Sequence, residues 1–342
     1  MREGCCHVTK CRRGRALAAL CAILMLAGCA AGERPLATAV PEQTPGVVLS
    51  PAQEGKPQIP TKLELNEDGE PLLDVYDVKR SQVVSMPIEE YVCGVLAGEM
   101  RGDWPLEALK AQAILARTFV LKFIQEKESR YPGADISTDI EEAQAYEPAA
   151  VNERIEQAVE ETRGLVLSSG GELPYAWFHA HSGGQTALAE EGLDYKGGEP
   201  PYTRSVAGME SDEADEEAAQ WEASFSAAQV LKAAQKTGAS GNQLTEISVA
   251  ERGDSGRATR LSVNGKAVSA AAFRIALGST EMRSTLIDSI TFSDGRVVIS
   301  GRGYGHGVGM SQWGAYAMAQ DGERAQDIVL HYFQNVEIVP LW

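Results

Sequence analysis

Cysteine is almost absent from the body of this 342-residue chain. Five of the six cysteines fall within the first 29 residues, so Cys93 alone stands beyond them. A single thiol forms no internal disulfide and supplies no cysteine-based metal site. Cys93 follows Val92 on a predicted helix, and we expect it to take part in core packing.

Positive charge is also scarce. The chain carries 31 Lys and Arg against 48 Asp and Glu, a formal net charge of -17. Nucleic-acid binding depends on cations that neutralise phosphates, so we exclude nucleic acid as a partner. Part of the acid is gathered in one short run of carboxylates: Glu210, Asp212, Glu213, Asp215, Glu216 and Glu217. This run lacks the ligand spacing and turn glycine of a calcium loop, and we predict a solvated loop.

Long apolar runs are missing except near the start of the chain. Three arginines within residues 12–15 precede an apolar run over residues 16–27, which ends at Gly28-Cys29. A basic start, an apolar run shorter than a typical spanning helix and small residues after it predict a bacterial export signal. The ending resembles a lipobox, which implies lipidation of Cys29 and an extracytoplasmic protein anchored to the outer face of the cytoplasmic membrane. An uncleaved membrane anchor is the alternative, and it gives the same compartment.

Three segments follow from this composition. We predict a lipoprotein signal peptide over 1–28, a flexible tether rich in Pro and Ala over 29–60, and a catalytic domain over 61–342. The whole chain is 44% hydrophobic and 23% charged, which is typical of a globular protein. Its length is sufficient for one large core or two lobes.

Helical and strand patterns are segregated along the chain. Helices are predicted over 86–100, about 104–126 and 151–162, and near 312–320 and 324–334. Three β-hairpins are predicted over 165–179, 260–268 and 290–299, the last two around the turn pairs Asn264-Gly265 and Asp294-Gly295. This order indicates an α+β fold in which a helical hairpin packs with antiparallel β-hairpins, in one lobe or two.

Glu99 stands where the apolar stripe of the first predicted helix should carry another aliphatic side chain. Ile88, Val92, Val95 and Glu99 share one helical face by their spacing. A carboxyl group that faces a core or cleft at a helix C-terminus should have a raised pKa, as a general acid requires. We therefore predict Glu99 as a catalytic acid; a solvated Glu in a frayed last turn is the alternative. Asp103, just before the second helix, is expected to cap it.

Glycine recurs at every second position from Gly301 to Gly309. If the segment is extended, Arg302, Tyr304, His306 and Val308 share one face, and the bare opposite face admits a ligand or another backbone. No window fits a nucleotide-phosphate loop. His306 is either a site residue or a hydrogen-bonded structural histidine.

A second polar segment runs from Phe178 to Thr186. His179 and His181 share a face if the strand persists, which is a possible zinc pair, but spacing identifies no third ligand. We expect the polar side chains His179, Ser182 and Thr186 to lie at the edge of a cleft, and we predict no metal and no cofactor.

Several separated motifs together resemble the stage II sporulation protein D family. They cover residues 87–91, 98–100, 104–113, 116–118 and 303–312, and the likeness extends over about 63–342, with Ser255-Gly256-Arg257 and Phe273-Arg274. The resemblance implies a peptidoglycan lytic transglycosylase of sporulation and engulfment, which acts on glycan strands whose peptides a partner amidase has removed. Its catalytic acid matches Glu99, and Arg117 matches a position important for activity.

The resemblance also bears on substrate binding and metal. Arg117, Tyr304, His306 and Gln312 are expected to orient the sugar. Many family members carry a cysteine-rich zinc segment where residues 137–146 stand here without cysteine. A lipid anchor takes the place of the more usual membrane helix.

Two other functions stay open at this point. One is a non-catalytic wall-binding protein that enhances a peptidoglycan amidase, as some members of the same superfamily are named. The other is a metal-dependent wall hydrolase that uses His179, His181 and His306, whose activity chelators would abolish.

Overall fold

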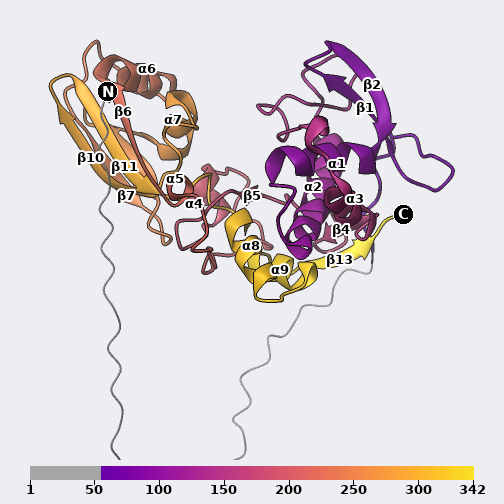
Figure 1. The fold of residues 1–342 in the computed structure, drawn as a ribbon. Coiled ribbons are helices and arrows are strands. Elements are labelled where there is room, and N and C mark those ends of the chain that lie inside the picture. The colour runs from indigo at the N-terminus through magenta and orange to yellow at the C-terminus, as the bar shows by residue number, and fades with distance from the viewer. Residues whose placement is uncertain (1–54) are drawn as a thin grey trace, which may run out of the picture. The chain divides into compact units, whose positions relative to one another are not determined.

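The structure is a computed structural model that describes residues 55–342 (Figure 1). The predicted signal peptide, Cys29 and all but the last residues of the predicted tether lie outside the described residues. The described end of that tether belongs to the fold, because Ile59 packs against the main core and Lys56 Nζ donates to the Pro340 carbonyl at 3.4 Å. Within residues 55–342, no helix has the length and apolar character needed to cross a membrane.

The fold is α+β, with several small sheets. The first part of the chain contains β1 (Leu72–Asp77), β2 (Gln82–Pro87), α1 (Ile88–Glu99), α2 (Leu106–Glu126), β3 (Ile136–Ser137), the 3-10 helix η1 (Pro148–Ala150), α3 (Glu153–Glu160), β4 (Leu165–Ser168), β5 (Phe178–His179) and α4 (Ala189–Leu193). The middle part contains α5 (Glu216–Ala219), β6 (Gln220–Ser226), α6 (Ala227–Lys236), β7 (Ile247–Arg252), β8 (Ala258–Val263), β9 (Lys266–Ser269), α7 (Ala270–Leu277), β10 (Ile287–Ser293) and β11 (Arg296–Arg302). The chain closes with β12 (Met310–Ser311), α8 (Gln312–Gln320), α9 (Ala325–Tyr332) and β13 (Glu337–Pro340).

The predicted pair of helices is confirmed in α1 and α2, which pack against each other. Each follows a proline, Pro87 and Pro105, whose fixed φ suits the start of a helix. The prediction that Asp103 caps α2 was wrong. Asp103 is exposed and 3.8 Å from the Arg101 side chain, and no side chain caps this helix.

Helix α2 lies at the centre of the main hydrophobic core. It packs against α1, α3, β4, α8 and α9, so segments from both ends of the described chain meet on it. Most of its side chains between Ala108 and Ile124 are buried. The expected packing role of Cys93 is confirmed, because its half-buried side chain contacts this core.

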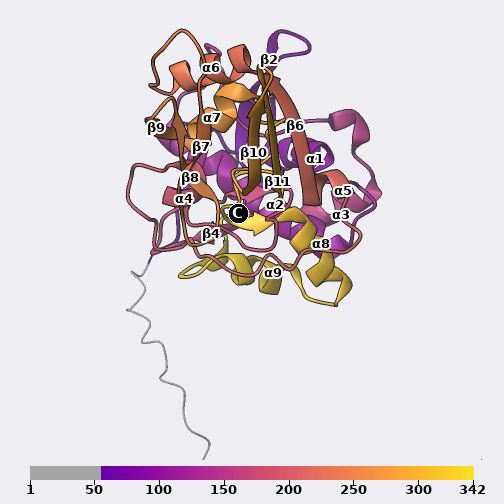
Figure 2. The same cartoon turned by 90° about the vertical axis from the view of Figure 1, so that its left-hand side faces the viewer.

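A second hydrophobic core is built from residues between Trp221 and Ile299. Two three-stranded sheets, β10-β11-β6 and β7-β8-β9, contribute to it together with α6 and α7 (Figure 2). Both predicted hairpins in this region are confirmed. Their turns have positive φ at both central residues, 51° and 74° at Asn264-Gly265 and 52° and 72° at Asp294-Gly295, as a type I′ turn requires.

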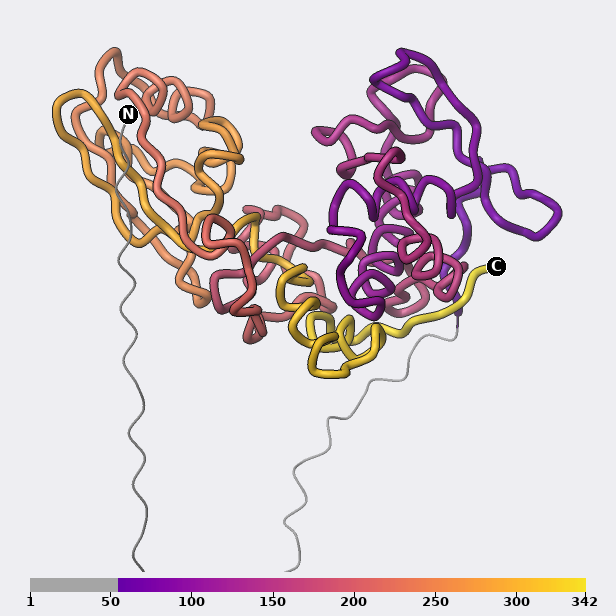
Figure 3. Tube along the Cα trace, viewed as in Figure 1, coloured from indigo at the N-terminus to yellow at the C-terminus, as the bar shows by residue number. Residues whose placement is uncertain are grey.

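The hairpin predicted over 165–179 was wrong. Strand β4 pairs with β13 at the other end of the chain, antiparallel, and β5 pairs with β12, parallel. Only an isolated bridge joins Ser169 to Glu172. Figure 3 shows the C-terminal segment returning beside the early part of the chain. Local turn residues carry no information about a partner some 170 positions away, which is why the pattern suggested the nearer pairing.

Candidate active site

Glu99 is the last residue of α1, and its side chain is half-buried. Its Oε1 accepts a hydrogen bond of 2.7 Å from the Ala145 N–H. Burial raises the pKa of the Glu99 carboxyl above its ordinary value of 4.5, while the bond from Ala145 and the amide of Gln312 oppose that rise. A carboxyl group that is held in place and has a raised pKa keeps its proton to a higher pH than an ordinary Glu does, as a proton donor requires.

Two glycines on α1 allow the irregular segment 144–147 to lie directly against the helix beside Glu99. The Glu147 N–H donates to the Gly94 carbonyl at 2.9 Å, and a Cβ on Gly94 would lie 2.3 Å from the Tyr146 ring. A Cβ on Gly98 would lie 2.7 Å from the Ala145 backbone. The bare helix surface is therefore what brings the Ala145 N–H to the carboxylate of Glu99.

We expect Gly98→Ala to impair the site more than the fold. A helix interior favours Ala over Gly by about 1 kcal/mol, but the new methyl group displaces residues 144–147, a clash of a kind that costs about 1–3 kcal/mol. Any activity that depends on Glu99 should fall at least about tenfold with a small loss of stability. Activity assays and urea unfolding measure the two effects. Glu90→Ala, on the exposed face of the same helix, is the control, and a fully active Gly98→Ala protein would contradict this account.

Gln312, in the first turn of α8, lies close enough to Glu99 for its amide to lower the pKa of that carboxyl. The preceding residue, Ser311, caps this helix by accepting the Gly314 N–H. The Gln312 Nε2 also lies 3.5 Å from Gln112 Oε1 on α2, and no protein group within residues 55–342 bonds Gln112 Nε2. We had expected Glu99 to meet the glycine-rich stretch near His306 and Arg117. Instead, Arg117 pairs with Glu89 and His306 bonds Val308, and the amide that acts on the Glu99 carboxyl belongs to Gln312, just beyond the stretch. Gln112 was not predicted, although an amide inside the apolar run Leu109 to Leu115 was the available signal.

The sequence suggested that Glu210 lies in a solvated loop. The structure shows instead that its carboxylate is held by other groups. Its carboxylate accepts hydrogen bonds from the Ser182 N–H at 2.7 Å and the Ser311 Oγ at 3.0 Å, and it lies 3.6 Å from His181 Nε2. Burial raises the pKa of this carboxyl. Glu210 thereby joins residues 181–182 to the N-terminus of α8, one position before Gln312.

Other carboxylates of the acidic run also have partners. Glu213 accepts a hydrogen bond from the Tyr316 hydroxyl at 2.8 Å, and Asp215 lies 3.9 Å from Arg101, next to the end of α1. Glu217 pairs with Arg283 at 2.8 Å. These members of the run are exposed, as predicted for a solvated loop, and the three contacts tie them to neighbouring side chains at the surface.

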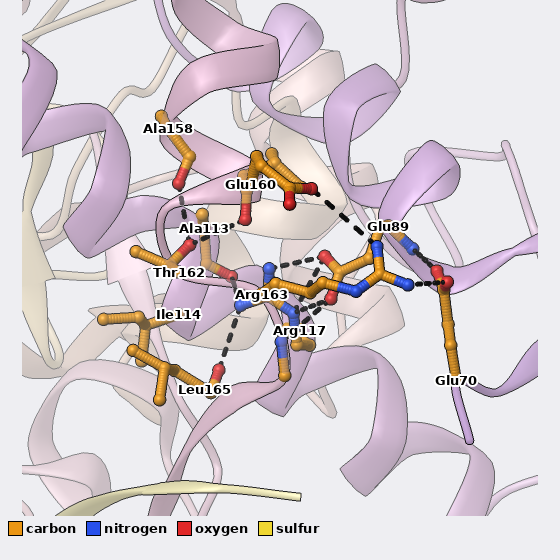
Figure 4. A network of polar contacts seen from close by, with 12 residues as sticks. Glu70, Glu89, Ala113, Ile114, Arg117, Ala158, Glu160, Thr162, Arg163 and Leu165 are labelled. Atoms are coloured by element: carbon orange, nitrogen blue, oxygen red, sulfur yellow. Dashed lines mark hydrogen bonds and ion pairs between the residues drawn. The ribbon is translucent and has the colours of Figure 1, made fainter. Parts of the chain in front are cut away.

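Arg117 lies in a buried network with Glu89 (Figure 4). Its guanidinium pairs with Glu89 at 2.6 Å and donates to the Leu165 carbonyl at 2.9 Å. Glu89 stands ten positions before Glu99 on the same helix, a separation of about 15 Å. Arg117 therefore does not contact Glu99. Its side chain joins α1, α2 and β4.

The same network continues to the surface. Glu89 accepts the Gly164 N–H at 3.0 Å, and the Glu89 N–H donates to Glu70 at 3.1 Å. Glu70 in turn pairs with Arg163 at 2.5 Å. Each buried charge thus has an opposite charge or a backbone donor, as burial of charged groups requires.

The glycine-rich stretch is not an extended strand beyond Arg302. Gly303, Gly305, Gly307 and Gly309 have φ between 71° and 112°, which breaks the expected alternation of faces. The space beside the glycines is filled by the protein itself. A Cβ on Gly307, for example, would lie 2.3 Å from the Arg257 guanidinium.

The side chains of this stretch accordingly diverge. Arg302 is exposed and pairs with Asp288 at 3.1 Å, while Val308 is fully buried. Tyr304 lies under Arg283, whose guanidinium carbon is 5.3 Å from the ring centre. No common substrate face formed by Arg302, Tyr304, His306 and Val308 is present.

The histidines lie in a tight, mainly buried cluster. His179 Nδ1 is 3.1 Å from the Val308 carbonyl, and its ring centre is 5.8 Å from that of His306. His181 Nδ1 accepts the Gly183 N–H at 2.9 Å. Across residues 55–342, no group of three or more His, Cys, Asp or Glu side chains is arranged to hold a metal ion.

Ser182 and Thr186 are fully buried. The Ser182 Oγ accepts the Gly184 N–H at 3.1 Å, and the Thr186 Oγ1 accepts the Val206 N–H at 2.8 Å. These two hydroxyl groups hold loops together. Among the predicted binding residues, Gln312 is the one that lies close to Glu99.

We next compared the chain with known protein families and proteins. The family described as Stage II sporulation protein, SpoIID, matches residues 76–168, and a domain of unknown function, DUF8618, matches 203–309. Stage II sporulation protein D of Bacillus amyloliquefaciens is 32% identical over 77% of this chain and 77% of its own length. The chain belongs to the stage II sporulation protein D family.

Other relatives widen the picture. The Bacillus subtilis stage II sporulation protein D is 30% identical over 78% of both chains. An uncharacterized protein of Brachyspira hyodysenteriae is 31% identical over 75% of this chain and 68% of its own. A Bacillus subtilis protein named amidase enhancer is 27% identical over 72% of this chain but 40% of its own length. Glu99 lies within residues 76–168, the segment that the sporulation family model covers.

In this member of the sporulation protein D family, we expect His306→Asn to reduce the loss of folding stability at acidic pH. Burial and the charges of Arg274 and Arg257 lower the pKa of His306 to about 3, and its Nδ1 accepts the Val308 N–H at 3.0 Å. The unfolded chain takes up this proton near pH 6.5 and the native protein does not, so stability is present above that pH and lost as the pH falls.

Asn keeps an acceptor at the Nδ1 position but does not titrate. Between pH 6.5 and 4, its unfolding midpoint in urea should therefore fall less than that of the parent protein. His331→Asn, at a more exposed histidine, is the control. Parallel pH profiles for parent and His306→Asn would contradict the expectation.

Proposed function

We propose that this protein is a peptidoglycan lytic transglycosylase that cleaves peptide-free glycan strands during sporulation, with Glu99 as both acid and base. Family membership and the likeness to a protein named amidase enhancer support a cell-wall-related role. The observation that carries the proposal is Glu99 itself, a half-buried carboxyl with a raised pKa, held by the Ala145 N–H and close to Gln312. We also propose that a lipid on Cys29 anchors the protein outside the cytoplasmic membrane.

The first step requires a protonated acid. Glu99 donates its proton to the oxygen that links N-acetylmuramic acid to N-acetylglucosamine, the glycosidic bond breaks, and positive charge develops at the muramic C1. Partial burial favours the protonated carboxyl in the resting protein. The Ala145 N–H keeps the Glu99 side chain in one position, so little orientational entropy is lost when the sugar arrives.

The second step uses the carboxylate that the first step leaves. Glu99 accepts the proton of the muramic C6 hydroxyl, whose oxygen attacks C1 and closes a 1,6-anhydro ring without water. The donor amide of Gln312 and the Ala145 N–H stabilise the carboxylate between the two steps. One carboxylate is enough for this route, in contrast to the pair that glycoside hydrolases use.

Product analysis tests the proposal. The soluble protein from Gly55 onward, which keeps the contacts of residues 56–60 with the core, is incubated with peptide-free glycan strands. Mass spectrometry should detect 1,6-anhydromuramic ends. Reducing ends would indicate a hydrolase with an activated water and would overturn the proposed route.

The amidase-enhancer alternative makes a different prediction. Intact glycan, bound but not cut, together with stimulation of an added peptidoglycan amidase, would replace the enzyme assignment by a binding role. A chelator should leave cleavage unchanged under our proposal, whereas its loss would favour the metal-dependent alternative.

A further inference from the structure

An aromatic pocket of about 250 Å³ lies beside the C-terminal half of α2, beyond Gln112. Aromatic rings from α2 and from residues 175–195 line it: Phe119, Phe123, Tyr175, Trp177 and Tyr195. None of these residues contributes to the Glu99 site as described above. Pockets with aromatic walls and a few polar groups at the rim are typical ligand sites.

The rings form a corner rather than a flat wall. Tyr175 and Trp177 stack with centres 5.0 Å apart and planes 15° apart, and Tyr195 stands at 70° to the first and 71° to the second. A saturated ring can pack in such a corner because its C–H bonds carry partial positive charge and aromatic faces carry partial negative charge. Its polar substituents then point toward solvent.

Lys127 places a positive charge at the rim of the pocket. Its ammonium lies 5.6 Å from the centre of the Phe123 ring, and its side chain is exposed. Among residues 55–342, no carboxylate pairs with Lys127. Its neighbour Lys122, by contrast, pairs with Glu126 at 2.6 Å. The Tyr175 hydroxyl donates to Glu126, whose charge is balanced by Lys122. The pocket therefore combines an apolar corner with one further cation, Lys127, that is available to an anionic ligand.

The position of the pocket relates it to the Glu99 site. Phe119 is seven residues beyond Gln112 on α2, two turns that return to the same helical face, and about 10 Å along the axis. The Gln112 end of that face contacts Gln312. Gln112, Leu115 and Ala116 on this part of α2 are fully buried, so a strand that reaches both Glu99 and the pocket has to pass over the surface outside this face.

We propose that the aromatic pocket binds a muramyl residue of the glycan strand at a distance from the bond that is cut. The pyranose ring packs on the Trp177 and Tyr195 rings, and the lactyl carboxylate pairs with Lys127. This inference rests on the proposed function for its choice of glycan, because a peptide-free strand carries one such carboxylate on every second sugar. The charge of the strand complements the cation at the rim.

Direct binding tests this inference without requiring cleavage. Calorimetry compares peptide-free glycan strands with chitin oligosaccharides, which have N-acetylated rings but no carboxylate. Lys127→Glu should weaken binding of peptide-free glycan roughly five- to tenfold and leave chitin binding unchanged. Trp177→Ala should weaken both, and its thermal unfolding shows whether the pocket still folds. Lys232→Glu, an equal charge change at an exposed site on α6, is the matched control.

The outcomes separate this proposal from the function itself. Equal effects of Lys127→Glu and Lys232→Glu would overturn the pocket assignment even if cleavage by Glu99 is intact. Loss of glycan binding in Lys127→Glu would support it even if no cleavage occurs. A change in sedimentation with unchanged glycan binding would instead assign the pocket to contacts between copies of the chain, and would also overturn the proposal.

Discussion

Replacing Glu99 by Gln should lower glycan cleavage by at least about 1,000-fold while the protein stays folded. General acid and base catalysis each contribute about 10²–10⁴-fold, and in the proposed mechanism one carboxyl group performs both. Gln has nearly the same shape, and its carbonyl oxygen can still accept the Ala145 N–H. The variant therefore removes the proton transfer and keeps the geometry. Initial rates of anhydro-end formation measure the effect.

Stability provides the control for this variant. Because the pKa of Glu99 is raised in the native protein, its ionisation weakens the fold as the pH rises through that raised value. Glu99→Gln removes this loss, so at neutral pH the variant should be at least as stable as the parent. Equal glycan binding with no cleavage would agree with the prediction. Substantial cleavage by a folded Glu99→Gln protein would remove Glu99 from the mechanism.

The proposed mechanism also predicts how the activity of the parent protein depends on pH. In that mechanism cleavage starts from protonated Glu99, so kcat/KM should decline as the pH rises above the raised pKa of this group. The decline should have the slope of a single ionisation, since within residues 55–342 no carboxylate is among the groups that shift the pKa of Glu99. Gly98→Ala, which disturbs the hydrogen bond from Ala145, should move the midpoint upward, because that bond lowers the pKa.

Local signals in the sequence predicted local structure well. The prolines before α1 and α2, the turn pairs at Asn264 and Asp294, and the bounds of α8 were all visible in short windows. Helices α6 and α7 were not predicted, and the partner of β4 was assigned to the wrong strand. Pairings such as β4 with β13 depend on the whole chain folding, and alternation of side chains carries no record of them.

Some residues of the candidate site could likewise be predicted from local sequence, and others could not. Glu99 was predictable because a carboxylate interrupts an apolar stripe, which is a local irregularity. The contact from Ala145 was not, because it depends on the missing side chain of Gly98, 47 positions earlier. Glu210 stood in a run of acids that resembled a solvated loop, and only the folded chain distinguishes it from its exposed neighbours.

Arg117→Met should strongly destabilise the protein, by about 3–5 kcal/mol. It leaves the Glu89 carboxylate buried with the Gly164 N–H but without its ion-pair partner. Typical domains have a total stability of about 5–15 kcal/mol, so the variant should unfold at much lower urea concentration. Arg117→Lys should also be destabilised, because an ammonium group cannot reproduce the bonds from Nε and Nη2 to both carboxylate oxygens.

A double variant separates the ion pair from packing. Combining Arg117→Met with Glu89→Gln removes both charges, and its loss of stability should be smaller than the sum of the two single losses. If Arg117 acts on catalysis only by holding α1, the folded fraction of Arg117→Met should cleave glycan at the parent rate when assayed at low temperature. A stable variant with no activity would instead require direct contact between Arg117 and substrate, which its complete burial opposes.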